Sequence, residues 1–210
     1  MKKIICIFLV FGLILSLQVY SFADNKEKKL TFWGIDFGTE YTDVMRKVNN
    51  EFEKSKISTG QVLRFSDEEQ YQEYIEVDDK IKITKEFNAE TIDFVFVMGE
   101  LMNLDEDSLI LASGKYYIRK QSEANRDKII NLLLSMYGEP DKEEREEKYE
   151  KTVYTWTGFE DDCELIVSIS DKSGDIVLEY LSNVILEKGM ENYKATVELV
   201  NAYEENYNMF

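Results

Sequence analysis

The stretch "CELIVSISDKSGDIVLEYLS", residues 163–182, decides the fold. On both sides of its centre apolar residues alternate with polar ones, and "DKSGD" between them contains the polar residues and the glycine of a tight turn. Alternation of this kind is typical of antiparallel strands with one buried face. The stretch therefore predicts a β-hairpin whose buried face carries Leu165, Val167, Ile169, Leu178 and Tyr180.

The residues before this hairpin predict a helix and one more strand. "SEANRDKIINLLLSMYG" has Ser122 near its start, Gly138 just past its end and Pro140 shortly beyond, which are the expected start and stop residues of a helix. "KTVYTW", residues 151–156, alternates like a strand, and the mixed charges of "KEEREEKYEK", residues 142–151, indicate a solvated connection. The buried side chains should be Ile129, Ile130, Leu133, Leu134, Tyr137 and Trp156.

The first half of the chain repeats this order. A short strand is predicted at "LTFWGI", residues 30–35, followed by a turn with Thr39 as the cap of a helix over residues 41–52. Residues 55–80 are polar and indicate a long connection with at most one strand. Three strands are then predicted at "KIKITKEF", "TIDFVFVMGELM" and "SLILASGKYYI", residues 80–87, 91–102 and 108–118.

The expected fold is therefore α+β, with two similar α-β-β-β halves whose helices pack on antiparallel sheet. The halves span residues 24–120 and 121–188, and a C-terminal helix occupies 189–210, beginning near Glu191. One side of that helix carries Tyr193, Val197, Val200 and Tyr207. A helix of this length is marginal alone in water, so we expect it to pack on its own sheet near Ile166, Val177 and Leu181; the alternative is a partner or a second copy.

Residues 1–23 have the pattern of a secretory signal peptide. Lys2 and Lys3 precede an apolar run that is short for a membrane span, and small residues at Ser21 and Ala23 mark a cleavage site. We therefore expect a periplasmic or secreted protein with no membrane span after cleavage.

Composition bears on which partners the protein can bind and on whether it contains disulfides. The net charge of −17 disfavours binding to nucleic acid, whose phosphates carry the same sign. After cleavage Cys163 is the one cysteine left, so no intrachain disulfide is expected. Its place in the alternation indicates a small buried residue, and pairing with another chain is the alternative.

The sequence gives little support to catalysis or metal binding. It contains no histidine, which removes Ser-His-Asp and Cys-His catalysis and imidazole metal sites. Acidic clusters occur at Asp105, Glu106 and Asp107 and at Glu160, Asp161, Asp162 and Glu164, and neither has the spacing of an EF-hand loop. We expect no catalytic, cofactor-binding or metal-binding residue, and no cofactor. Calcium binding by these loops stays open, as does a carboxylate-dependent enzyme acting on an extracytoplasmic substrate such as a glycan.

Two stretches of the sequence resemble a family of small exported bacterial proteins. "FWGIDFGTEYTDVMRKV" looks like the glycine-turn-helix opening of small exported bacterial proteins, and "LLSMYGEPDKEE" with the strands after it is similar to their second half. Their architecture resembles that of the outer-membrane assembly lipoprotein BamE and of the β-lactamase inhibitory protein, whose tandem helix-and-sheet units bind partners. The resemblance covers most of residues 31–186. This chain has neither a usable lipobox cysteine nor disulfide-forming pairs, so no binding residue is transferred from either family. The export signal, the absent catalytic constellation and the paired helix-on-sheet plan together predict an exported, non-enzymatic binding or envelope-associated protein with a protein partner.

We predict that the exported protein begins at or near Asp24, because signal peptidase cuts after a small-residue pattern such as Ser21-Phe22-Ala23. Mass spectrometry of protein from the native envelope measures this directly. An intact segment from Met1 to Ala23 would instead indicate a membrane anchor.

Overall fold

The computed structural model describes residues 28–65, 69–83, 87–100 and 108–207, without side-chain detail for 62–65, 69–70 and 203–207. The helices and strands follow in this order: α2 (Tyr41–Glu51), β1 (Ile57–Phe65), β2 (Glu69–Lys82), β3 (Asn88–Met98), β4 (Leu109–Ile118), α3 (Glu123–Tyr137), β5 (Lys142–Glu146), β6 (Lys151–Trp156), β7 (Cys163–Ser170), β8 (Ile176–Ser182) and α4 (Asn183–Tyr207). The fold is α+β, as predicted.

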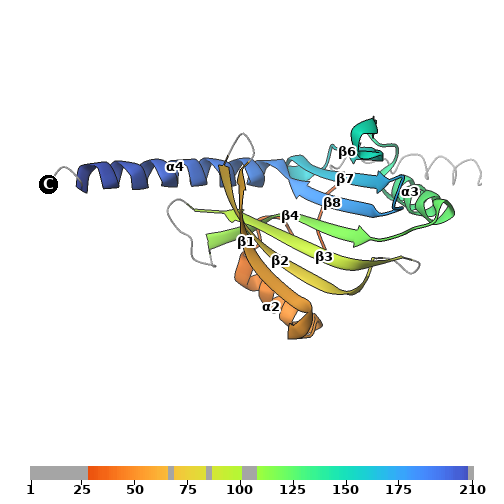
Figure 1. The fold of residues 1–210 in the computed structure, drawn as a ribbon, viewed down its shortest axis with the longest axis horizontal. Coiled ribbons are helices and arrows are strands. Elements are labelled where there is room, and N and C mark those ends of the chain that lie inside the picture. The colour runs from red at the N-terminus through yellow and green to blue at the C-terminus, as the bar shows by residue number, and fades with distance from the viewer. Residues whose placement is uncertain (1–27, 66–68, 84–86, 101–107, 208–210) are drawn as a thin grey trace, which may run out of the picture.

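All eight strands belong to one antiparallel sheet with the order β1-β2-β3-β4-β8-β7-β6-β5. The fourth and the last strand along the chain lie side by side in the middle of the sheet. There β4 pairs with β8 from Ser113–Leu181 to Ile118–Ile176. This pairing joins β1–β4 and β5–β8 into a continuous surface (Figure 1). In each of these groups a helix is followed by four strands, one more than predicted. That the two groups are related repeats stays a prediction.

Helices α2 and α3 cover one face of the sheet, which we call the core face. Val44 and Val48 of α2 and Ile129 and Leu133 of α3 are buried in one cluster with alternate residues of the strands. The predicted buried set is confirmed: all of its members belong to this cluster or pack against its edge, namely Ile129, Ile130, Leu133, Leu134, Tyr137, Trp156, Leu165, Val167, Ile169, Leu178 and Tyr180. The predicted ends of α3 are also confirmed, since the Asn125 N–H donates to the Ser122 hydroxyl and Gly138 has a positive φ of 87°.

Residues 30–35 do not form the predicted strand. Trp33 and Gly34 both have positive φ, and Phe32 and Ile35 exchange backbone hydrogen bonds of 3.0 and 2.8 Å across the resulting turn. The turn pushes the Phe32 ring into the core against Gly114 of β4, where a Cβ atom would lie 2.0 Å from the ring. The apolar residues of this segment therefore fill the core as a plug and do not alternate between two faces. Thr39 also does not cap α2, because the N-cap residue is Glu40.

Two segments that the sequence predicted as connections are strands. Residues 55–80 contain β1 and most of β2, and residues 142–151 contain β5. For β1 and β5 the cause is the same, since both are edge strands and edge strands tolerate polar residues on both faces. The predicted strand over residues 80–87 is wrong, because β2 ends at Lys82 and Ile83 bonds back to Phe87 across a hairpin end.

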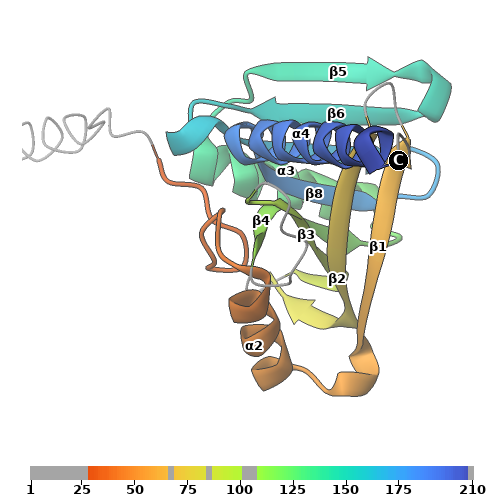
Figure 2. The same ribbon diagram turned by 90° about the vertical axis from the view of Figure 1, so that its left-hand side faces the viewer.

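Helix α4 packs on the opposite face of the sheet, which we call the outer face. It crosses β2, β3 and β4, and α2 lies on the other side of the same strands (Figures 1 and 2). Packing on its own sheet is confirmed, with Gly189 against Val97 and most contacts to β2 and β3 rather than to the strands of Ile166, Val177 and Leu181. Val200, expected on the covered side, is 43% exposed. The helix also begins at Asn183, earlier than expected, and its Ile185 N–H lies 3.5 Å from the Ser182 hydroxyl at its start.

The N-terminal segment 1–23 lies outside the described residues. Within the described part of the chain, no helix is both long enough and apolar enough to span a membrane.

We predict that Gly189→Ala destabilises the protein by about 1–3 kcal/mol, a typical cost of overpacking. In an exposed helix the same change would be stabilising, by up to about 1 kcal/mol, because alanine favours helix more than glycine. Here an added Cβ would lie 2.4 Å from the Cβ of Val97, so helix and sheet would have to separate. Urea denaturation measures the change, with exposed Lys188→Ala as the control. A gain in stability for Gly189→Ala would show that α4 does not rest on Val97.

Candidate binding surface

Strand register places a group of half-buried polar and apolar side chains on the outer face. Glu76, Asp93, Lys115, Glu179 and Ile166 lie opposite one another in that order across β2, β3, β4, β8 and β7. In the next row Tyr117 of β4 lies opposite Val177 of β8. We call these seven residues the outer patch: Glu76, Asp93, Lys115, Tyr117, Ile166, Val177 and Glu179.

An ion pair lies at the centre of the outer patch. The Nζ of Lys115 is 2.8 Å from Oε1 of Glu179, and the two side chains are only 18% and 28% exposed. Such shielding makes the charges interact more strongly than a fully exposed pair would, and it also fixes both side chains in place. The pair neutralises Lys115 and leaves Glu76 and Asp93 as uncompensated acids beside it.

Asp93 has a buried carboxyl oxygen without a hydrogen-bond partner in the described part of the chain. Its Oδ1 is inaccessible to solvent and has no hydrogen-bond partner among the described residues. Burial raises the pKa of the Asp93 carboxyl above its ordinary value, and the hydrogen bond with Tyr117 acts in the opposite direction. The charge of Glu76 raises this pKa further, while Lys115 lowers it. An unsatisfied buried carboxyl costs stability, and folded proteins retain such groups most often where they serve a function.

Helix α4 forms one border of the outer patch. A crevice of about 370 Å³ lies between them, lined by Lys115 and Glu179 from the sheet and by Leu186, Glu187 and Met190 from α4. The helix leaves Tyr117, Ile166 and Val177 of the sheet half-buried, and it adds an acid and two apolar side chains to the rim. The surface combines the apolar side chains of Ile166 and Val177 with the acids beside the central ion pair, as protein-binding surfaces commonly combine apolar and polar groups.

The acidic cluster at residues 160–164 is spread over an exposed turn and the start of β7. Glu160, Asp161 and Asp162 are exposed on a short 3₁₀ turn, and Glu164 accepts a hydrogen bond of 3.0 Å from Asn183. Residues 105–107 lie outside the described residues. Among the residues that the structure places, no group of three or more possible metal ligands comes together. Cys163 is buried, with 4% of its surface exposed, in accord with the strand alternation.

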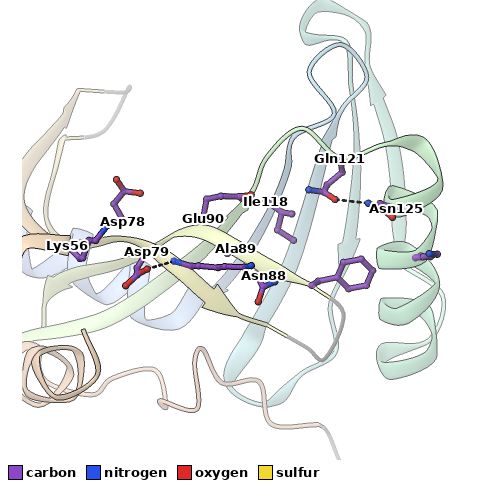
Figure 3. A pocket seen from close by; sticks show the side chains of 12 residues that line it. Lys56, Asp78, Asp79, Asn88, Ala89, Glu90, Ile118, Gln121 and Asn125 are labelled. Atoms are coloured by element: carbon purple, nitrogen blue, oxygen red, sulfur yellow. Dashed lines mark hydrogen bonds between the residues drawn. The ribbon is translucent and has the colours of Figure 1, made fainter. Parts of the chain in front are cut away.

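A polar pocket lies between the β2–β3 end of the sheet and the start of α3 (Figure 3). Its volume is about 530 Å³, and its charged residues balance, with three lysines and three acids: Lys56, Lys80, Lys128, Asp78, Asp79 and Glu90. Its amides are used internally, since the Asn125 side chain donates to the Gln121 side chain at 3.2 Å. This balanced, open pocket favours no particular ligand.

Comparison with known proteins provides no assignment. No family model matches the sequence, and neither a curated protein nor a solved structure matches the chain. Function must therefore be argued from the residues themselves.

Sequence reasoning missed the outer patch, although part of the signal was present. Asp93, Lys115 and Glu179 are charged residues at alternate positions of clearly predicted strands, on the face opposite the core. Their adjacency depends on the pairing of β4 with β8, two strands that are distant in the chain, and nothing in a single sequence specifies that pairing.

We predict that Asp93→Asn stabilises the protein at pH 7. A carboxyl whose pKa is raised on folding binds its proton more tightly in the folded state than in the unfolded state. Below the unfolded pKa the carboxyl is protonated in both states, so its ionisation does not destabilise the fold there. As the pH rises above that value, ionisation costs the folded state free energy. The asparagine avoids this cost and still accepts a hydrogen bond from Tyr117.

Urea denaturation at pH 7 and near pH 3 tests this, with exposed Asp127→Asn as the control. The stability advantage of Asp93→Asn should be present at pH 7 and should shrink at the lower pH. A variant less stable than the parent at pH 7 would show that the Asp93 carboxylate stabilises the fold.

Proposed function

We propose that this chain is an exported, non-enzymatic binding protein that holds a protein partner on the outer patch. The observation that carries the proposal is the half-buried, acid-bordered apolar surface that α4 leaves uncovered. The signal-peptide pattern of residues 1–23 supports a periplasmic or secreted location. The exposed placement of Glu160, Asp161 and Asp162 on one short turn supports binding over carboxylate catalysis, which needs carboxyls in a cleft.

The charges of the patch specify the chemistry of the partner. Lys115 is already neutralised by Glu179, so Glu76, Asp93 and the nearby Glu187 set the local potential. A partner should therefore place an apolar side chain over Ile166 and Val177 and bring lysine or arginine to the acids. Charge complementarity of this kind speeds association and selects partners. A cation there would also favour the ionised form of Asp93.

The arrangement of the sheet supports the same proposal. Each of the groups α2-β1-β2-β3-β4 and α3-β5-β6-β7-β8 contributes four strands, and their junction at β4 and β8 runs through the outer patch. We propose that the two groups are tandem structural units and that the partner binds across their junction.

We expect Val177→Glu to abolish capture of the partner from native envelope extract without loss of folding. Val177 is half-buried on the outer face, so a carboxylate there adds negative charge to the patch without entering the core. The exported protein, Val177→Glu and a control, Leu199→Glu on the distal part of α4, are immobilised and their bound proteins quantified by mass spectrometry. Leu199 is 44% exposed and distant in sequence from the strands that form the patch.

A protein retained by the parent and by Leu199→Glu but lost with Val177→Glu, and released by raised salt, is the expected result. Equal retention by all three variants would exclude the outer patch as the binding surface.

A further inference from the structure

A second site lies on the core-face side of the sheet. It is a pocket of about 410 Å³ between the 31–34 segment, the β2–β3 end of the sheet and α3. This volume is in the range of small-molecule sites, roughly 300–1,000 Å³. We call it the tyrosine pocket, because three tyrosines of its wall come from β4, α3 and β8: Tyr116, Tyr137 and Tyr180.

Most of the pocket wall is apolar and incompletely covered. Trp33 and Leu132 are half-buried, and Met136 is 49% exposed, which is unusual for three large apolar side chains beside one cavity. Leu133 and Leu178 close the bottom of the pocket. A ligand with an apolar body would remove this surface from water, which stabilises the complex in proportion to the area buried.

The tyrosines supply hydrogen-bond donors inside the apolar wall. Tyr180 is hydrogen-bonded to Tyr137, and the bond acts to raise the pKa of Tyr180 and to lower that of Tyr137, as expected when Tyr180 donates and Tyr137 accepts. The backbone N–H of Trp33 is bonded to the Tyr116 hydroxyl. These bonds use the lone pairs of Tyr116 and Tyr137, so the O–H protons of both remain available to an acceptor on a ligand.

Three lysines surround the same pocket, in a protein with a net charge of −17. Lys82 lines it directly. The Nζ of Lys28 donates to the Met136 carbonyl at 2.9 Å, and the Nζ of Lys47 donates to the Trp33 carbonyl at 2.8 Å. Both carbonyls belong to residues of the pocket wall. None of the three lysines forms an ion pair with a described acidic residue.

From these observations we propose that the tyrosine pocket binds a small amphipathic anion from solution, with an apolar body and one carboxylate. The body lies against Trp33, Leu132 and Met136. The carboxylate accepts hydrogen bonds from Tyr116 and Tyr137, which are stronger than bonds to a neutral acceptor because the acceptor is charged. The lysines offset the repulsion that the acidic protein would otherwise exert on an anion.

The outer patch and the tyrosine pocket differ in the charge of the ligand that each favours. Tyr116 and Tyr117 are neighbours in β4 and point to opposite faces, and the same is true of Tyr180 and Glu179 in β8. The outer patch therefore holds three acids and one lysine, whereas the described residues that line the tyrosine pocket include three tyrosine hydroxyls and Lys82 but no acid. A cationic ligand suits the outer patch and an anionic one suits the tyrosine pocket, so either site can fail its test without affecting the other.

Three straight-chain probes test the proposal on the exported full chain. They are decanoate, its methyl ester and decyltrimethylammonium, each kept below its micelle concentration. Trp33 lies in the pocket and reports binding by its fluorescence, and Trp33→Phe identifies the signal against that of buried Trp156. We expect saturable binding of decanoate, weaker binding of the ester and none of the cation.

Two substitutions locate the carboxylate. Tyr137→Phe removes one hydroxyl donor and keeps the ring, so it should weaken decanoate binding about tenfold, the usual effect of losing a hydrogen bond to a charged group. Tyr154→Phe, in β6 and outside the pocket, is the matched control and should leave binding unchanged. Lys82→Gln should weaken decanoate about two- to fivefold and leave the ester unaffected.

Several results would overturn the proposal. Equal binding of all three probes, or an unchanged decanoate affinity in Tyr137→Phe, would show an apolar surface without selection for an anion. No binding of decanoate at millimolar concentration would exclude the ligand class. Binding to phosphatidylglycerol vesicles without binding of free decanoate would assign the pocket to a membrane surface instead.

Discussion

The pairing of β4 with β8 is the constraint on which the rest of the molecule depends. It joins residues that are 58 to 68 positions apart, from Ile118–Ile176 to Ser113–Leu181, and so requires the chain as far as β8 to be in place. Closing so long a segment costs chain entropy, which is recovered when both sheet faces are covered. Phe32 lies at this junction, with its ring near those of Phe94, Tyr116 and Tyr180. The first described residues of the chain thus hold together the strands formed before and after α3.

How far the sequence predicts this fold depends on the position of each strand in the sheet. The alternation in β7 and β8 identifies their residues almost exactly, because one face is buried along β7 and along most of β8. The residues of β6 are also predicted correctly, although most of them are only half-buried. The edge strands were not predicted because their burial differs from that of the inner strands. All five residues of β5 are charged, which protects an open edge from pairing with other chains and also hides the strand from a search for apolar periodicity.

Glycines show a second limit of sequence reasoning. Gly138 behaved as expected, because a positive φ after a helix is a local property of the chain. Gly189 was read as the boundary before a helix, yet it lies inside α4, where the absence of a side chain lets the helix approach Val97. Gly114 similarly makes room for the Phe32 ring. A sequence shows that a glycine is present, but it does not show whether the reason is a turn or a neighbour distant in the chain.

The two candidate sites were hidden because they are properties of the assembled sheet. Neither Tyr116 nor Tyr117 stands out alone, and a strand with two adjacent tyrosines reads simply as half-buried. Pairing with β8 places Tyr116 near Tyr180, and pairing with β3 places Tyr117 beside Asp93, so one dipeptide contributes to both faces. Since the sheet between the faces is a single layer, the same β4 and β8 backbone supports an acidic surface and a donor-lined pocket. The charge segregation follows from the strict alternation of side chains, because every residue added to one face leaves its neighbours to the other.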